Sequence, residues 1–187
     1  MDCNVFIIHG AEGHPKENWF PWLKKELELL DCKLFVPQFP TPKNQTLSKW
    51  LKVFDKYKNY INKNSIVVGH SLGVIFLLNI LEVYSVRAAF FVAGFCSDPE
   101  NELSSSMNTF TNKTFNWSKI KNNCKNFFIY QSDNDPYVPV SKGKELAKNL
   151  DSKLIIIKNA GHFNEESGYI KFELLLNNIK KVITKHL

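Results

Sequence analysis

The sequence predicts an α/β domain built on a predominantly parallel, doubly wound sheet with helices on both faces. Two observations lead to this prediction. Segments typical of strands and segments typical of helices alternate along the 187 residues. The strand segments are continuous apolar runs, as is typical of strands buried on both faces of a parallel sheet. No internal repeat or linker interrupts the pattern, so residues 1–187 are expected to form a single domain.

The individual elements follow from the apolar pattern. Strands are expected at residues 4–8, 33–36, 66–68, 88–93, 126–131 and 154–157. Helices are expected at residues 19–30, 47–61, 74–84, 140–150 and 169–184. Asn18 and Thr46 are of the residue types that cap helix N-termini, so they are expected to cap the first two helices.

Residues 97–117 break this alternation. Their apolar periodicity is weak, and Asn, Ser and Thr dominate the segment. Long connections in compact domains are commonly functional, so we expect a loop or short-helix insertion at the rim of a pocket. About twenty residues suffice for a minimal cap but not for a full lid domain.

Residues 69–73 read Gly-His-Ser-Leu-Gly and lie between a strand segment and a helical segment. This Gly-x-Ser-x-Gly arrangement is typical of a nucleophile elbow, a sharp turn that exposes a serine hydroxyl. An ordinary Gly-rich turn is the alternative, but the strand before and the helix after are the context that the elbow requires. The motif therefore predicts Ser71 as a nucleophile and the N–H of Leu72, at a helix N-terminus, as a donor to an oxyanion.

The loop after the first strand begins with His9, Gly10 and Ala11. In enzymes with this elbow, backbone N–H groups of that loop face the nucleophile. The N–H of Ala11 is the expected second oxyanion donor, with Gly13 as the less favoured alternative. His9 is expected to hold the loop by hydrogen bonds.

A serine nucleophile needs a base, and the base needs a carboxylate that fixes its tautomer. His162 follows the last expected strand, beside a glycine that leaves its ring room to approach the elbow. Asp135 stands in a rigid Asp-Pro turn after the preceding strand, and Asp133 is the competing carboxylate. Ser71, Asp135 and His162 are therefore the predicted catalytic residues, while His70 is expected to pack near the sheet.

Aromatic residues near the expected strand ends are candidates for a substrate pocket, with burial in the core as the alternative for each. These candidates are Trp19, Phe95, Phe110, Trp117, Tyr137 and Phe163. The predicted chemistry requires no metal and no organic cofactor, and the sequence has no Cys/His spacing typical of a metal site.

The formal net charge of +6 raises the question of an anionic partner. The lysines are dispersed along amphipathic segments, without a block of five or more, and Arg87 is the single arginine. Proteins that read nucleic acids depend on arginine for base and phosphate contacts. A solvated, lysine-rich surface is therefore expected, with no nucleic-acid partner.

The cysteine content and the N-terminus indicate a cytoplasmic protein. Cys3, Cys32, Cys96 and Cys124 are scattered without CxxC spacing, which suits reduced thiols better than a disulfide framework. The first residues lack a basic start followed by an apolar stretch, and no apolar run reaches about 18 residues. We expect neither a signal peptide nor a membrane span, and the oligomeric state is not indicated.

The sequence resembles the α/β-hydrolase superfamily, and within it the compact serine hydrolases related to retinoblastoma-binding protein nine and their bacterial YdeN-type members. The resemblance covers nearly the whole chain. Its most specific part is Trp-Phe-Pro-Trp-Leu at residues 19–23, joined by His9-Gly10, the elbow, Asp135-Pro136 and Gly161-His162. The resemblance implies the same roles for Ser71, Asp135 and His162. Asn134 departs from it, because the family often has a second acid there.

Together, the residues and the resemblance predict a serine hydrolase that cleaves small carboxylic esters through an acyl-serine intermediate, with amides as a further substrate class. A small-molecule ester is the expected partner. The alternative is a binding protein on a hydrolase scaffold with little turnover. Its signature would be a missing member of the triad, and none is missing.

Overall fold

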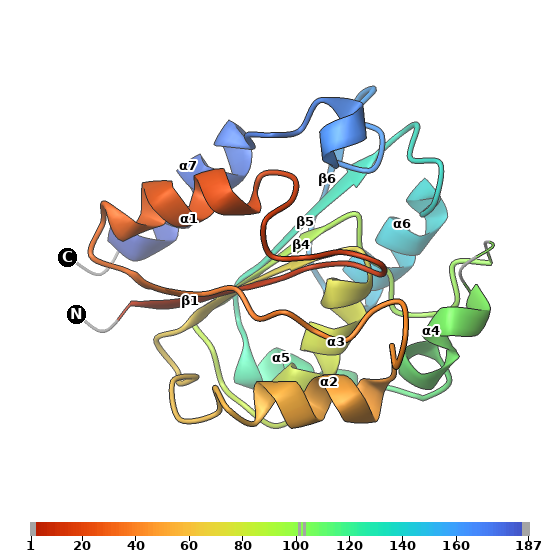
Figure 1. Ribbon diagram of the computed structural model, residues 1–187, viewed down its shortest axis with the longest axis horizontal. Helices are drawn as coiled ribbons and strands as arrows, with labels where there is room; N and C mark the ends of the chain where they lie inside the picture. Colours follow the sequence, from red (N-terminus) through yellow and green to blue (C-terminus); the bar gives the residue numbers. More distant parts are fainter. Residues whose placement is uncertain (1–2, 101, 103, 185–187) are drawn as a thin grey trace.

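A parallel six-stranded sheet forms the centre of the computed structural model, which describes residues 3–100, 102 and 104–184 (Figure 1). Within these residues the spatial order of the strands is β2-β1-β3-β4-β5-β6, and every neighbouring pair is parallel. The strands are β1 (Asn4–Ile8), β2 (Lys33–Phe35), β3 (Ile66–His70), β4 (Ala88–Val92), β5 (Phe127–Ser132) and β6 (Leu154–Ile157). The predicted parallel α/β architecture is confirmed.

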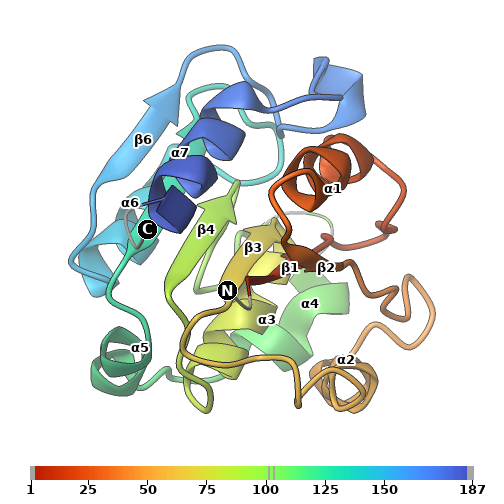
Figure 2. The same cartoon turned by 90° about the vertical axis from the view of Figure 1, so that its left-hand side faces the viewer.

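Helices cover both faces of the sheet (Figures 1 and 2). One face carries α1 (Phe20–Glu28) and α7 (Glu173–Thr184). The other carries α2 (Leu47–Phe54), α3 (Leu72–Leu81), α4 (Ser104–Thr111), α5 (Trp117–Asn123) and α6 (Val140–Asn149). A short 3-10 helix, η1 (Glu165–Ser167), follows β6.

Two apolar clusters lie on the two sides of the sheet, and the strands supply alternate residues to each. In β1, for example, Phe6 and Ile8 pack with α2 and α3, whereas Val5 and Ile7 pack with α1 and α7. Each central strand is therefore buried on both faces. This double burial explains why the strands appear in the sequence as continuous apolar runs.

The order of the strands places a switch point between β1 and β3. From β1 the chain winds outward to β2 and then returns to β3, from which it continues in the opposite direction to β6. Loops that leave the carboxyl ends of two such strands diverge, and the crevice between them is the usual ligand site of an open α/β sheet. The loops after β1 and β3 are those that begin at His9 and Ser71.

Several helix boundaries differ from the sequence-based expectations. The second helix ends at Phe54, because residues 55–60 form turns, and the last helix begins at Glu173. Thr46 caps α2 as predicted, its side chain accepting from the N–H of Lys49 at 3.4 Å. The expectation for Asn18 was wrong, since Trp19 stands at the N-cap of α1 and Asn18 adopts a positive φ of 52°.

The expectation of four reduced thiols is corrected by the structure. Cys3 and Cys32 form a disulfide, while Cys96 and Cys124 are free and buried. The pairing of β1 with β2, in which Asn4 lies opposite Lys33, brings the two preceding cysteines together. A separation of 29 residues gives no spacing signal in the sequence. The expectation of reduced cysteines was one of the observations behind the cytoplasmic prediction, and the disulfide removes it.

Among the described residues, no helix is long and apolar enough to pass through a bilayer. The longest of these helices, α7, has 12 residues. A membrane-spanning helix needs about 20 apolar residues. The apolar side chains of α7 pack against the sheet instead.

Gly73 fixes how closely α3 approaches β1, and we predict that Gly73→Ala destabilises the fold. A Cβ at this position would lie 2.7 Å from the carbonyl oxygen of His9 and closer still to that of Ile8. Because both obstacles are backbone, the loss of unfolding free energy should exceed about 2 kcal/mol in urea denaturation.

Gly168→Ala is the control for this substitution. Gly168 has a φ of 83° with nothing within 4 Å of its added Cβ, so only backbone strain of about 1 kcal/mol is expected. Equal losses for the two variants would contradict the packing argument for Gly73.

Candidate active site

Ser71 occupies a strained turn between β3 and α3. Its φ of 52° and ψ of −121° are unusual for a residue with a side chain. The N–H of Ser71 donates to the carbonyl of Val92 at 2.9 Å, which extends the strand pairing with β4 by one residue. A Cβ on Gly10 would lie 3.0 Å from the Cβ of Ser71, so the loop after β1 passes directly beside the serine. The turn therefore has the geometry of a nucleophile elbow.

The imidazole of His162 is hydrogen-bonded to the carboxylate of Asp135. Nδ1 of His162 lies 2.8 Å from Oδ2 and 3.0 Å from Oδ1 of Asp135. The carboxylate side chain has no exposed surface, and Oδ1 also accepts from the N–H groups of Tyr137 and Val138. Because an ionised carboxylate only accepts, Nδ1 carries the proton, and Nε2 of His162 is left with its lone pair.

The competing carboxylate, Asp133, has a different function in the structure. Its Oδ1 accepts from the N–H of Asn159 at 2.8 Å, and the residue is exposed. Between the two aspartates, Asn134 accepts from the N–H of Gly161 at 2.8 Å and from the hydroxyl of Ser132 at 2.7 Å. Asp133 and Asn134 therefore tie the loop after β5 to the loop that carries His162, and of the two aspartates it is Asp135 that bonds to the imidazole.

His70 is hydrogen-bonded to the backbone of the loop that carries His162. Its Nε2 lies 2.7 Å from the carbonyl oxygen of His162, so this nitrogen carries the proton and donates. Burial, together with the nearby His162, lowers the pKa of His70 to about 3. Nδ1 of His70 has no hydrogen-bond partner among the described residues. The ring is packed near the sheet as expected and positions the backbone of His162.

His9 holds the loop after β1 as the sequence predicts. Its Nδ1 donates to the carbonyl of Gly10 at 2.8 Å, and its Nε2 accepts from the N–H of Phe39 at 3.0 Å. Burial lowers the pKa of His9 to about 4, so the ring is neutral at pH 7. The neutral imidazole thus uses both nitrogens and fixes the peptide between Gly10 and Ala11.

The N–H groups of this loop differ in their partners. Glu12 donates to Oγ1 of Thr41 at 2.7 Å, and Gly13 donates to the carbonyl of Gly10 at 3.4 Å. Within the described residues, no acceptor is found for the N–H of Ala11. Leu72, as the first residue of α3, also has an N–H without an intrahelical partner. Ala11 and Leu72 therefore have N–H groups available on the two sides of the switch point.

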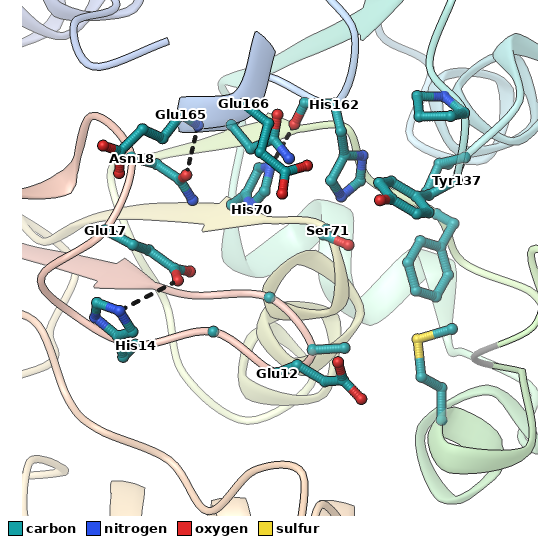
Figure 3. Close-up of a pocket in the computed structure, with 18 of the residues that line it drawn as sticks. Glu12, His14, Glu17, Asn18, His70, Ser71, Tyr137, His162, Glu165 and Glu166 are labelled. Atoms are coloured by element: carbon teal, nitrogen blue, oxygen red, sulfur yellow. Dashed lines mark hydrogen bonds and ion pairs between the residues drawn. The ribbon is translucent and has the colours of Figure 1, made fainter. Parts of the chain in front are cut away.

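A cavity of about 750 Å³ lies over Ser71 and His162 (Figure 3). Both residues line it, and in Figure 3 the hydroxyl of Ser71 lies below the imidazole of His162, on the side of Tyr137. Phe95 and Met107 add apolar surface. Met107 belongs to α4, so the insertion at residues 97–117 contributes to the rim of the cavity.

Of the six aromatic residues expected at the pocket, Phe95 and Tyr137 line it and four do not. Trp19, Phe110 and Phe163 have no exposed surface, and Trp117 packs on Phe115 with ring centroids 5.4 Å apart. Nε1 of Trp19 donates to the carbonyl of Phe163, which places both residues behind the His162 loop. These four residues therefore follow the alternative expectation. Trp19, Phe110 and Phe163 are buried in the core, and Trp117 packs against it.

The acidic residues of the cavity were missed by the sequence analysis. Glutamates line it from three segments of the chain, at positions 12, 17, 102, 165 and 166. Glutamate is usually a solvated surface residue, and no motif contains these positions. The sequence carries no signal that would have identified them.

Neither free cysteine offers a competing nucleophile. Burial raises the pKa of Cys96 and of Cys124 to about 12, so both are protonated thiols at neutral pH. In the described part of the chain, no group of three or more His, Cys, Asp or Glu side chains is arranged to hold a metal ion. Ser71 and His162 are therefore the candidate reactive groups that line the cavity.

Comparison with known proteins defines the class to which this fold and site belong. The crystal structure of the ydeN gene product from B. subtilis superimposes with a TM-score of 0.90, at 29% identity, over 97% of this chain and 98% of that chain. Mouse alpha/beta hydrolase domain-containing protein 10 has the same fold, with a TM-score of 0.72, 17% identity and coverage of 98% and 90%. The fold is that of the α/β hydrolases.

Sequence comparison defines the family. The model of the family described as "Serine hydrolase" matches residues 5–181. The chain is 30% identical to the putative hydrolase YdeN of Bacillus subtilis, over 99% of this chain and 98% of that protein. It is also 30% identical to the serine hydrolase RBBP9 of Rattus norvegicus, over 94% and 92%. The chain therefore belongs to the serine hydrolase family.

The lowered pKa values of His9 and His70 predict a loss of stability in mild acid. In the unfolded chain, His9 and His70 take up protons below about pH 6.5, whereas in the folded protein they remain neutral down to about pH 4 and 3. The unfolded state thus binds more protons between these values. The free energy of unfolding should fall by about 2 kcal/mol per histidine between pH 7 and pH 5 in urea denaturation. A His9→Asn variant with an undiminished pH dependence would contradict the assignment of His9.

Proposed function

We propose that this serine hydrolase cleaves small carboxylic esters through an acyl-serine intermediate, with Ser71 as nucleophile, His162 as base and Asp135 as its orienting carboxylate. The observation that carries the proposal is that His162, hydrogen-bonded to Asp135, lines the same cavity as Ser71, which stands on a strained elbow. Amides are a second substrate class for the same chemistry.

In the first half of the reaction, Oγ of Ser71 attacks the ester carbonyl and gives its proton to Nε2 of His162. The resulting imidazolium is stabilised by Asp135, 2.8 Å from Nδ1. His162 then gives the proton to the departing alcohol. In the second half, water attacks the acyl-serine with His162 again as base, which releases the acid and restores the hydroxyl.

The oxyanion of each tetrahedral intermediate needs donors that are already in place. The N–H groups of Leu72 and Ala11 are proposed for this role, because both are free on the two sides of Ser71. The His9 ring supports the second donor, since it holds the carbonyl of Gly10 and thereby the peptide to which the N–H of Ala11 belongs.

The cavity favours short or medium acyl groups. Its volume of about 750 Å³ lies within the range of small-molecule sites. Phe95 and Met107 provide apolar contacts, and the described residues between β4 and β5 form only the short helices α4 and α5 rather than a separate lid domain. These features support small esters over long lipid chains.

Removing the nucleophile is the first test. We predict that a fluorophosphonate probe labels the wild-type protein and the surface variant Ser85→Ala but not Ser71→Ala. Hydrolysis of p-nitrophenyl butyrate by Ser71→Ala should fall by about a millionfold, because the triad acts as a unit. Labelling or turnover that survives in Ser71→Ala would contradict the proposal and favour a binding function on a hydrolase scaffold.

The two aspartates provide a matched pair for the second test. Asp135→Asn should lower kcat/KM for p-nitrophenyl butyrate by about a thousandfold or more, because an amide at this position no longer enforces the required tautomer of His162. Asp133→Asn should stay within about twofold, since an amide oxygen still accepts from the N–H of Asn159. Equal losses in the two variants would contradict the role of Asp135.

A further inference from the structure

Gln45 is a buried polar residue that the proposed chemistry does not use. It lies in the loop between β2 and α2 and is 5% exposed. It is not one of the residues that line the cavity over Ser71. A buried side-chain amide is favourable only where its oxygen and its nitrogen both have hydrogen-bond partners. The partners of Gln45 therefore indicate its function.

The oxygen of this amide holds the loop that follows β1. Oε1 of Gln45 accepts from the N–H of Glu12 at 3.2 Å and from the hydroxyl of Thr41. Oγ1 of Thr41 accepts from the same N–H of Glu12 at 2.7 Å. Two side chains of one loop thus converge on a single backbone N–H, which lies 29 and 33 residues earlier in the chain.

The nitrogen of the amide holds helix α4, which is a neighbour of α2 in Figures 1 and 2. Nε2 of Gln45 donates to the hydroxyl of Ser106 at 3.2 Å and to the carbonyl of Ser106 at 3.4 Å. Thr109 of the same helix accepts from the N–H of Leu47 at 3.0 Å. The residue after Ser106 is Met107, which lines the cavity. Gln45 therefore connects the loop after β1 to the helix that forms part of the cavity rim.

This set of partners requires a glutamine. The N–H of Glu12 needs an acceptor, whereas the carbonyl of Ser106 needs a donor. A carboxylate at position 45 would supply the acceptor but no donor, and an apolar side chain would supply neither. The planar amide supplies both, and its partners fix which end of the amide points to the loop after β1.

The peptide that Gln45 holds is next to the proposed oxyanion donor. The N–H of Ala11 belongs to the peptide between Gly10 and Ala11, whose carbonyl accepts from His9. The N–H of Glu12 belongs to the following peptide. Glu12 has a φ of 56°, which is an unfavourable conformation for a residue with a side chain. The loop is therefore held by hydrogen bonds on both sides of Ala11, against the local preference of its backbone.

We infer that Gln45 is a positioning residue for the oxyanion hole, because its amide binds both the N–H of Glu12 and Ser106 and thereby keeps the N–H of Ala11 in place. The inference rests on the proposed function, in which that N–H stabilises the oxyanion. Without these bonds the peptide after Ala11 is free to rotate. Stabilisation of the transition state is then lost, while binding of the substrate is little changed.

Gln45→Met tests the inference, because methionine has a similar size and shape but no amide. Per active site titrated with a fluorophosphonate, kcat for p-nitrophenyl butyrate should fall at least about tenfold with KM within about threefold. A complete oxyanion donor is worth about a hundredfold. The inhibition constant of butylboronic acid, which forms a tetrahedral adduct with the hydroxyl of Ser71, should rise at least about tenfold. A loss of folded protein would lower the number of active sites without changing that constant.

Thr41→Val removes the other acceptor of the same N–H from a half-buried position. Its kcat should fall at least about threefold with little change in KM. Since both side chains act on the N–H of Glu12, the loss in the double variant with Gln45→Met should be smaller than the product of the two separate losses. Should Gln45→Met fail to fold, Thr41→Val decides the test alone.

Asn4→Leu is the matched control. Asn4 is also a buried amide bonded to a distant backbone, since its Nδ2 donates to the carbonyl of Tyr60 at 2.7 Å. It stands at the first residue of β1, at the end of the strand away from the cavity. This variant should lose stability in urea but keep kcat and the boronate inhibition constant within about twofold of wild type.

The outcomes separate the inference from the proposed function. Wild-type values of kcat and of the boronate constant in Gln45→Met and Thr41→Val, or equal changes in Asn4→Leu, would overturn the inference while the proposed function stands. A wild-type protein that hydrolyses no ester and binds no boronate would overturn the proposed function, and the inference with it.

Discussion

The contact between the backbone of α3 and the end of β1 is the constraint on which the site depends. Gly69 and Gly73 lack the side chains that would separate the elbow from its neighbours, and the carbonyls of Ile8 and His9 occupy the space where a Cβ of Gly73 would lie. Since β1 and β3 pair in register with Ile8 opposite Gly69, the two loops that follow them start at the same level. Gly10, in the loop after β1, therefore lies directly beside Ser71 at the start of α3.

Two neutral histidines complete this arrangement, and their chemistry is that of hydrogen-bonding groups rather than of bases. A neutral imidazole offers one donor and one acceptor. His9 uses both on the backbone of neighbouring loops, while His70 donates to the carbonyl of His162. Burial makes the charged form of both rings costly, so His9 and His70 act as neutral hydrogen-bonding groups.

The grouping of Ser71, Asp135 and His162 at one end of the sheet was predictable from the sequence, because each residue stands at a strand end with a local signal. Ser71 lies in a motif, and His162 and Asp135 follow strands in turns rich in Gly or Pro. The sequence favours Asp135 over Asp133 because Pro136 makes its turn rigid. In the structure it is the carboxylate of Asp135 that accepts from the N–H groups of that turn and contacts His162, whereas Asp133 accepts from Asn159.

The surroundings of the site were less predictable. Hydrophobicity does not distinguish an aromatic ring at a cavity rim from one in the core, which is why Trp19 and Phe163 were expected at the pocket although they pack behind it. Contacts between distant segments carry no local pattern either. The Cys3–Cys32 disulfide and the glutamates of the cavity are both of this kind, and they arise from strand pairing and loop placement.

The loop that carries His162 is attached residue by residue to the first half of the chain. His70 donates to the carbonyl of residue 162, Trp19 donates to that of residue 163, and Asn18 accepts from the N–H of residue 165. These three bonds use backbone atoms, so they do not depend on the side chains of Glu165 and Glu166. Substitutions at residues 165 and 166 can therefore change the wall of the cavity while the imidazole of His162 keeps its position.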